Sequence, residues 1–181
     1  MNSLVYIARR LDLLSEWSGR LIAWLTLGMV AVTFAVVVLR YLFDIGWIAL
    51  QESVTYMHAL VFMLGAAYTL RHDGHVRVDI FYQRFGPRGK AWVDLFGTLL
   101  LLLPVTLFIA WASWDYVSSA WALKEGSPEA GGIPGVYLLK TAIPLMALLL
   151  TLQGLSLALR SLLVILGHEQ DAPAHDASTE V

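Results

Sequence analysis

Four long runs without a charged side chain constrain the fold of this chain more than any other feature. They cover residues 21–39, 53–70, 95–114 and 141–159, and His58 is the one histidine inside them. About 20 helical residues cross a hydrocarbon core of roughly 30 Å. The runs are continuous rather than alternating, which favours helices over the strands of a barrel. We therefore predict an all-α integral membrane protein with four transmembrane helices.

The composition agrees with a membrane protein and excludes several other classes. Hydrophobic residues make up 58% of the 181 residues and charged residues 14%, whereas soluble domains hold about 45–50% and about 25%. One small soluble core cannot bury this excess, and a disordered chain would not contain it. The net charge of −2 argues against a nucleic-acid binder. The absence of cysteine excludes disulfides, thiolate metal sites and a cysteine nucleophile.

The distribution of basic residues predicts the orientation in the membrane. Nine lysines and arginines lie in the N-terminal segment, in the second connection and after the fourth run. Three lie on the opposite side, namely Arg40, Lys124 and Lys140. Cytoplasmic loops carry an excess of basic residues, so we expect both termini in the cytoplasm.

We expect one four-helix membrane domain over residues 1–166, followed by a disordered cytoplasmic tail over residues 167–181, which is polar. The expected spans lie at about residues 20–40, 47–70, 92–116 and 138–160.

Two flanking segments have the spacing of short interfacial helices. Before the first run, Leu4, Ile7, Leu11 and Leu14 recur at helical spacing. This pattern fits an amphipathic helix on the inner membrane surface, and it equally fits an extension of the first span. In the second connection, the apolar residues of segment 78–85 predict a short interfacial helix, because an isolated strand there would leave backbone groups unpaired.

Glu52 and His58 are the ionisable side chains closest to the apolar interior. A carboxylate inside a membrane is costly unless it is paired, and Arg40 lies at the same outer end, so we predict an Arg40–Glu52 ion pair. We expect His58 to form a hydrogen bond between helices. A haem b site would need a second axial ligand from another helix, and the other three runs contain no histidine.

A dense polar group follows the second run at residues 71–79. His72, His75 and Asp79 could hold a metal ion, but Gly74 interrupts their helical spacing and the neighbouring arginines would repel a cation. We therefore favour a capped turn in which Gly74 ends the second helix. No nucleophile–base pair, phosphate-binding loop or zinc motif is present, and we predict no enzyme and no cofactor. The spans are also too poor in polar residues for a transporter that works alone, which points to an accessory subunit.

Three motifs resemble the small membrane subunit, or DctQ-like family, of tripartite ATP-independent periplasmic (TRAP) transporters. Arg40-Tyr41-Leu42-Phe43 resembles its Arg-Tyr-x-Phe signature, and Gln51-Glu52 resembles its paired glutamates. The family's most specific motif is resembled by segment 64–67 together with the residues that follow it, Gly74-His75-Val76-Arg77-Val78-Asp79. The chain departs from the family at Gln51, which is not acidic, and in a long, glycine-rich segment at residues 126–135. The resemblance covers roughly residues 20–165 and selects these candidates for structural or subunit contacts: Arg40, Tyr41, Phe43, Gln51, Glu52, Gly65, Gly74, His75 and Asp79.

The resemblance implies a scaffold role in the bacterial inner membrane. In that family, a large membrane subunit carries an organic acid in sodium-coupled uptake, a periplasmic binding protein delivers it, and the small subunit enlarges the static scaffold. Two alternatives from other classes stay open at this point. One is a stand-alone proton-coupled exporter that uses Glu52, and the other is a haem-binding membrane anchor of a redox enzyme.

Overall fold

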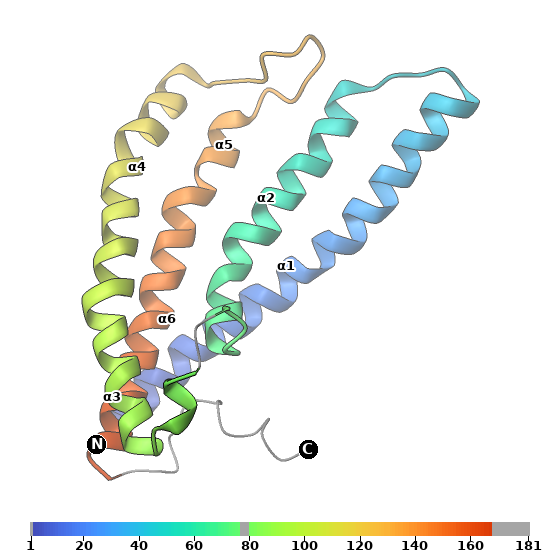
Figure 1. Cartoon of the computed structure of the whole chain (residues 1–181). Helices are drawn as coiled ribbons and strands as arrows, with labels where there is room; N and C mark the ends of the chain where they lie inside the picture. Colours follow the sequence, from blue (N-terminus) through green and yellow to red (C-terminus); the bar gives the residue numbers. More distant parts are fainter. Residues whose placement is uncertain (1, 77–79, 168–181) are drawn as a thin grey trace.

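The computed structural model describes residues 2–76 and 80–167, and its regular structure is helical, with no strand in these residues. Four helical segments are long and apolar enough to cross a membrane: Leu4–Leu42, Ile48–Arg71, Pro87–Leu123 and Val136–Ile165. Each apolar run seen in the sequence lies within one of them, which confirms the prediction of an all-α chain with four such helices (Figure 1). The expected tail beyond residue 167 lies outside the described residues.

The first helix, α1 (Asn2–Leu42), is continuous over 41 residues, or about 60 Å. The N-terminal segment is therefore an extension of the first span, which is one of the two alternatives that the sequence left open. The early turns of α1 are held by tertiary contacts, because Ala8 and Ser15 are buried at 2% and 1% exposure. A separate surface helix would instead leave these positions without a packing partner.

Helix α2 (Ile48–Arg71) returns antiparallel to α1 and packs closely on it. A Cβ atom added at Gly19 would lie 2.3 Å from Cδ2 of Tyr68, so glycine permits this close approach. The helix ends at Arg71, and the Gly74 N–H donates to the Thr69 carbonyl oxygen over 2.8 Å. A capped turn therefore follows α2 as predicted, but its left-handed residue is Asp73 (φ 53°) rather than Gly74.

The second connection contains less helix than the sequence predicts. Its regular structure is one 3-10 turn, η1 (Tyr82–Arg84), whereas residues 77–79 lie outside the described part of the chain. The Tyr82 hydroxyl donates to Oδ2 of Asp94 over 2.8 Å, and this contact anchors the turn to the following helix. The prediction of a short interfacial helix over residues 78–85 is therefore not confirmed, because its described part contains only this 3-10 turn.

The third and fourth long helices each contain an irregularity near a proline. The third consists of α3 (Pro87–Gly97), the π turn η2 (Thr98–Leu102) and α4 (Leu103–Leu123). The Leu103 N–H donates to the Thr98 carbonyl oxygen, one residue wider than an α-helical bond, immediately before Pro104. Proline interferes with the preceding helical turn, and the π turn absorbs this strain. The fourth consists of α5 (Val136–Lys140) and α6 (Ala142–Ile165).

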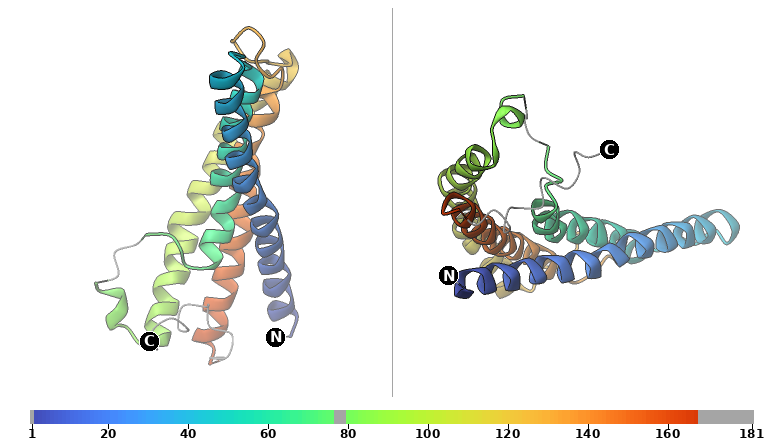
Figure 2. Two further views of the ribbon diagram at one scale, coloured as in Figure 1. Left: turned by 90° about the vertical axis from the view of Figure 1, so that its right-hand side faces the viewer. Right: turned by 90° about the horizontal axis from the view of Figure 1, so that it is seen from below.

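Helix α6 is the centre of the molecule, and the others pack around it in an open, curved arrangement (Figure 2). It contacts α1, α2, α3 and α4, whereas α4 has no comparable contact with α1 or α2. In its most apolar segment 39% of residues are buried, against 6% in α1 and 6% in α2. Most side chains of the outer helices are therefore exposed or only partly covered by the chain itself.

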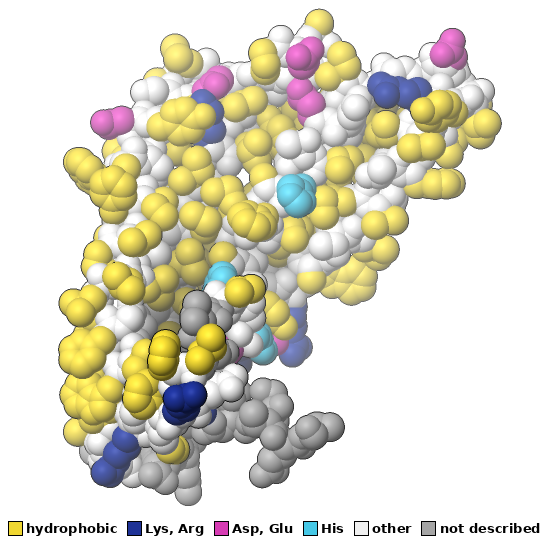
Figure 3. Space-filling view, in the orientation of Figure 1, with side chains coloured by type: hydrophobic (Ala, Val, Ile, Leu, Met, Phe, Trp, Pro, Cys, Tyr) yellow, Lys and Arg dark blue, Asp and Glu magenta, His cyan; other side chains and the backbone are white. Residues whose placement is uncertain are grey.

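The molecule has two polar ends separated by an apolar middle. On the face of the molecule drawn in Figure 3, most acidic side chains lie at one end and hydrophobic side chains cover the middle. We call the end that holds the turns 43–47 and 124–135 the loop end. The opposite end holds the start of α1 and the end of α6, and we call it the basic end (Figure 1).

Candidate functional site: polar clusters at the two ends of the helices

Asp12 forms the centre of a buried cluster between α1 and α6 at the basic end. Asp12 is buried, with only 5% of its surface exposed. It accepts hydrogen bonds from Gln153 Nε2 (3.1 Å), Ser156 Oγ (2.6 Å) and Arg160, whose Nε lies at 2.8 Å and whose Nη2 also donates. The three α6 residues share one face, because they are spaced by three and four residues. Pairing and hydrogen bonds offset the cost of burying this carboxylate.

Glu16, one turn further along α1, joins α1 to α2. Its carboxylate accepts from Arg71 Nη1 (2.8 Å), contacts His72 Nε2 (2.9 Å) and pairs with Arg20 Nε (2.7 Å). Arg71 Nη1 also donates to the backbone oxygen of Asp12 over 2.6 Å. The clusters of Asp12 and Glu16 are therefore continuous and fix α1, α2 and α6 relative to one another.

Glu52 anchors the loop end rather than the turn between α1 and α2. Its carboxylate accepts hydrogen bonds from the Ser127 hydroxyl and, over 2.7 Å, from the Ile133 backbone N–H. A Cβ atom at Gly132 would lie 2.8 Å from Glu52 Oε1, so this glycine lets the loop approach α2. Glu52 thus ties the segment between α4 and α5 to the start of α2.

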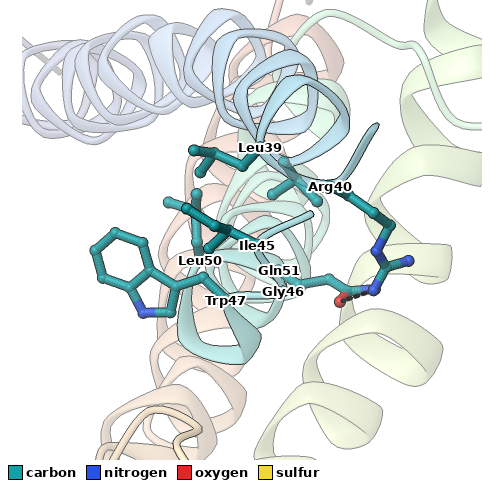
Figure 4. Close-up of a pocket in the computed structure, with 8 residues that line it drawn as sticks. Leu39, Arg40, Ile45, Gly46, Trp47, Leu50 and Gln51 are labelled. Carbon is teal, nitrogen blue, oxygen red and sulfur yellow. Dashed lines mark hydrogen bonds between the residues drawn. The ribbon is translucent and has the colours of Figure 1, made fainter. Parts of the chain in front are cut away.

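Arg40 donates a long hydrogen bond of 3.5 Å from Nη2 to Oε1 of Gln51 (Figure 4). The predicted Arg40–Glu52 ion pair is therefore wrong. Adjacent residues of a helix point about 100° apart, and only Gln51 faces the end of α1. The prediction placed the partner of Arg40 in the correct turn, but it chose Glu52 instead of its neighbour Gln51.

A second group of contacts at the loop end joins α4 to α5. Lys140 Nζ pairs with Glu125 Oε2 over 2.5 Å and lies 3.9 Å from the ring centroid of Tyr116. Trp121 Nε1 donates to Thr141 Oγ1 over 2.8 Å. Aromatic and basic side chains of this kind are typical of the membrane–water interface.

The other candidate residues lie apart from one another. Tyr41 and Phe43 are 79% and 62% exposed at the end of α1. Gly65 has no atom of another residue within 4 Å of the place where a Cβ would lie. His75 Nε2 lies 3.2 Å from the Ala66 carbonyl oxygen. Asp79 lies outside the described residues.

His58 is exposed on α2 and has no hydrogen-bond partner within the described part of the chain. The predicted hydrogen bond between helices is therefore not formed within the described residues. Within residues 2–76 and 80–167 no three His, Asp or Glu side chains form a metal-binding group. The metal alternative drawn from His72, His75 and Asp79 includes a residue outside these ranges.

Four apolar helices, with charged clusters confined to their ends, define a multi-pass membrane protein. The chain belongs to the DctQ family: the model described as "Tripartite ATP-independent periplasmic transporters, DctQ component" matches residues 29–164. The family is a transporter component that functions with a large membrane subunit and a substrate-binding protein, and it is not an enzyme family. No curated protein and no solved structure is significantly similar to the chain. The matched segment includes Arg160 and Glu52 but begins after Asp12 and Glu16.

Proposed function

We propose that the chain is the small scaffold subunit of a TRAP-type secondary transporter in the bacterial inner membrane. It would support a large membrane subunit in the sodium-coupled uptake of an organic acid that a periplasmic binding protein delivers. The observation that carries the proposal is that the acidic side chains form contacts within the chain. Asp12, Glu16 and Glu52 hold helices and loops of the chain together instead of facing a common path.

The distribution of charge supports an orientation with both termini in the cytoplasm. Arg71 and Arg160 lie at the basic end with the start of α1, and positively charged segments favour the cytoplasmic side. In this orientation the loop end faces the periplasm. The segment 124–135, fixed to α2 by Glu52, would then offer a rigid surface to the binding protein.

The hydrogen bonds of Glu52 favour the scaffold over the stand-alone exporter. A proton-coupling carboxylate must exchange its proton with a water path, whereas Glu52 accepts from Ser127 and from the backbone of Ile133. A haem anchor would require His58 to share an iron with a second ligand on another helix. The other three apolar runs contain no histidine that could be this ligand.

Reconstitution in liposomes tests the proposed function. We expect sodium-driven uptake when the chain, the large subunit and the binding protein are combined, and a loss of uptake when this chain is omitted. The chain reconstituted alone should carry no proton-coupled flux, and purified chain should show no Soret band. Flux by the isolated chain, or full uptake without it, would contradict the proposal.

A further inference from the structure

One face of α2 is exposed along most of the helix and has a regular spacing. Its members are separated by three, four, three and four residues, and they are Ile48, Gln51, Thr55, His58 and Phe62. An average spacing of 3.5 residues is that of the seam along which two helices pack in a left-handed pair. Within the described residues no other helix covers this seam, because its side chains are exposed, although Arg40 at the end of α1 donates a long hydrogen bond to Gln51.

The seam carries polar groups at a depth where lipid cannot satisfy them. His58 lies ten residues, or about 15 Å, from the start of α2. A threonine hydroxyl can bond to its own helix backbone, but an imidazole in mid-helix needs an outside partner. Lipid tails offer no hydrogen bond, and an unsatisfied polar group in hydrocarbon is costly. This face of α2 therefore fits protein better than lipid.

Gly65 continues the seam, three residues beyond Phe62. Nothing lies within 4 Å of the place where its Cβ would be, so packing inside this chain does not require a glycine there. Ala67, two residues later, is 1% exposed and packs within the chain. The small residues 65–67 thus serve two faces, and Gly65 leaves room for the close approach of an outside helix.

The other long exposed faces have the character expected of lipid contacts. The exposed side chains of α6 are all leucines: Leu145, Leu148, Leu155 and Leu162. Those of the third helix between residues 99 and 114 are likewise apolar, and Phe108 and Trp111 are among the most exposed. On α1, the exposed side chains between residues 21 and 37 are apolar apart from two threonines. The histidine of the α2 seam therefore distinguishes it from these faces.

We propose that the α2 seam, formed by Gln51, Thr55, His58, Phe62 and Gly65, binds a transmembrane helix of the large subunit. This helix packs left-handed against α2, approaches most closely at Gly65 and places a hydrogen-bonding side chain opposite His58. The proposal rests on the proposed function, because it assigns the face through which the scaffold contact is made.

A photoreactive phenylalanine tests which molecule covers the seam. Benzoylphenylalanine replaces Phe62 on the seam, and in matched controls it replaces Phe34 on α1 or Phe108 on α4, which are 75%, 70% and 61% exposed. Irradiation of the complete complex should crosslink position 62 to the large subunit and the two controls to lipid. Crosslinks from position 62 to lipid or to a second copy of this chain would overturn the assignment.

Two glycine substitutions test the close approach. We expect Gly65→Leu to lower co-purification of the large subunit at least fivefold, whereas Gly97→Leu leaves it unchanged. A Cβ atom added at either glycine meets nothing within 4 Å, and we expect both variants to fold. Gly65→Leu should also keep the melting temperature of the isolated chain. Equal recovery with both variants would overturn the assignment.

His58 variants test the hydrogen bond across the interface. His58→Ala should lower co-purification about threefold, in keeping with the modest strength of a hydrogen bond between membrane helices. His58→Gln should recover part of the loss, because it keeps a donor and an acceptor. If the wild-type chain does not retain the large subunit, the proposed function itself fails. If it does, and the seam variants behave like wild type, only the assignment of this face fails.

Discussion

Asp12 and Arg160 form an ion pair that joins the first helix to the last across 148 residues of sequence. Two charged side chains thus stabilise each other near the basic end, together with Ser156 and Gln153. The pair fixes the long α1 against α6, the most buried helix.

Replacing Asp12 by alanine should destabilise the isolated chain strongly. The change leaves Arg160 without its carboxylate, and removing one partner of a buried pair costs about 3–5 kcal/mol. The Arg160 side chain is 24% exposed, so we expect the lower end, about 3 kcal/mol. Thermal unfolding in detergent measures this effect, with Arg9→Ala as a control that changes an exposed charge of the same helix.

The double variant Asp12→Ala/Arg160→Met separates pairing from packing. With no unpaired charge left, it should melt closer to wild type than Asp12→Ala does. A double variant as unstable as the sum of the two single variants would show that the two residues act independently.

Replacing Glu52 by alanine should loosen the loop end without unfolding the helices. The Ser127 hydroxyl and the Ile133 N–H lose their charged acceptor, and a hydrogen bond to a charged group is stronger than one to a neutral group. Hydrogen exchange of the segment 127–133 should therefore become about tenfold faster or more. Glu129→Ala, in the same loop, serves as the control, and equal exchange in both variants would refute the anchoring role.

A methyl group at Gly19 should weaken the packing of α1 on α2. The added Cβ would collide with the ring of Tyr68, which must move, and overpacking typically costs about 1–3 kcal/mol. Gly97→Ala places a methyl group in open space and should leave the melting temperature unchanged or raise it slightly. An unchanged melting temperature for Gly19→Ala would show that the two helices separate easily.

Arg40→Ala should affect assembly more than stability. Its hydrogen bond to Gln51 is long and exposed, so the isolated chain should melt as wild type does. We expect weaker co-purification with the large subunit and lower uptake, with unchanged substrate preference. Asp79→Ala should act in the same way. Co-purification equal to wild type in both variants would remove these residues from the subunit interface.

The spans and the helical fold were predictable because they depend on local properties. Twenty apolar residues in a row form a helix in a bilayer whatever surrounds them, because each backbone group must bond within the helix. The capped turn after α2 likewise involves residues a few positions apart. The motifs that resemble the DctQ-like family are also read along the chain, and the family match confirms that resemblance.

The pairing of side chains across helices was not predictable in this way. Asp12 finds Arg160, and Glu52 finds Ser127 instead of Arg40, because the packing of α6 and the return of the outer loop bring distant segments together. The exposed position of His58 has the same origin, since a hydropathy pattern does not show which face of a helix its neighbours leave open. Hydrogen bonding within each span follows from local sequence, whereas the rotation and tilt of the helices follow from contacts between residues far apart in the chain.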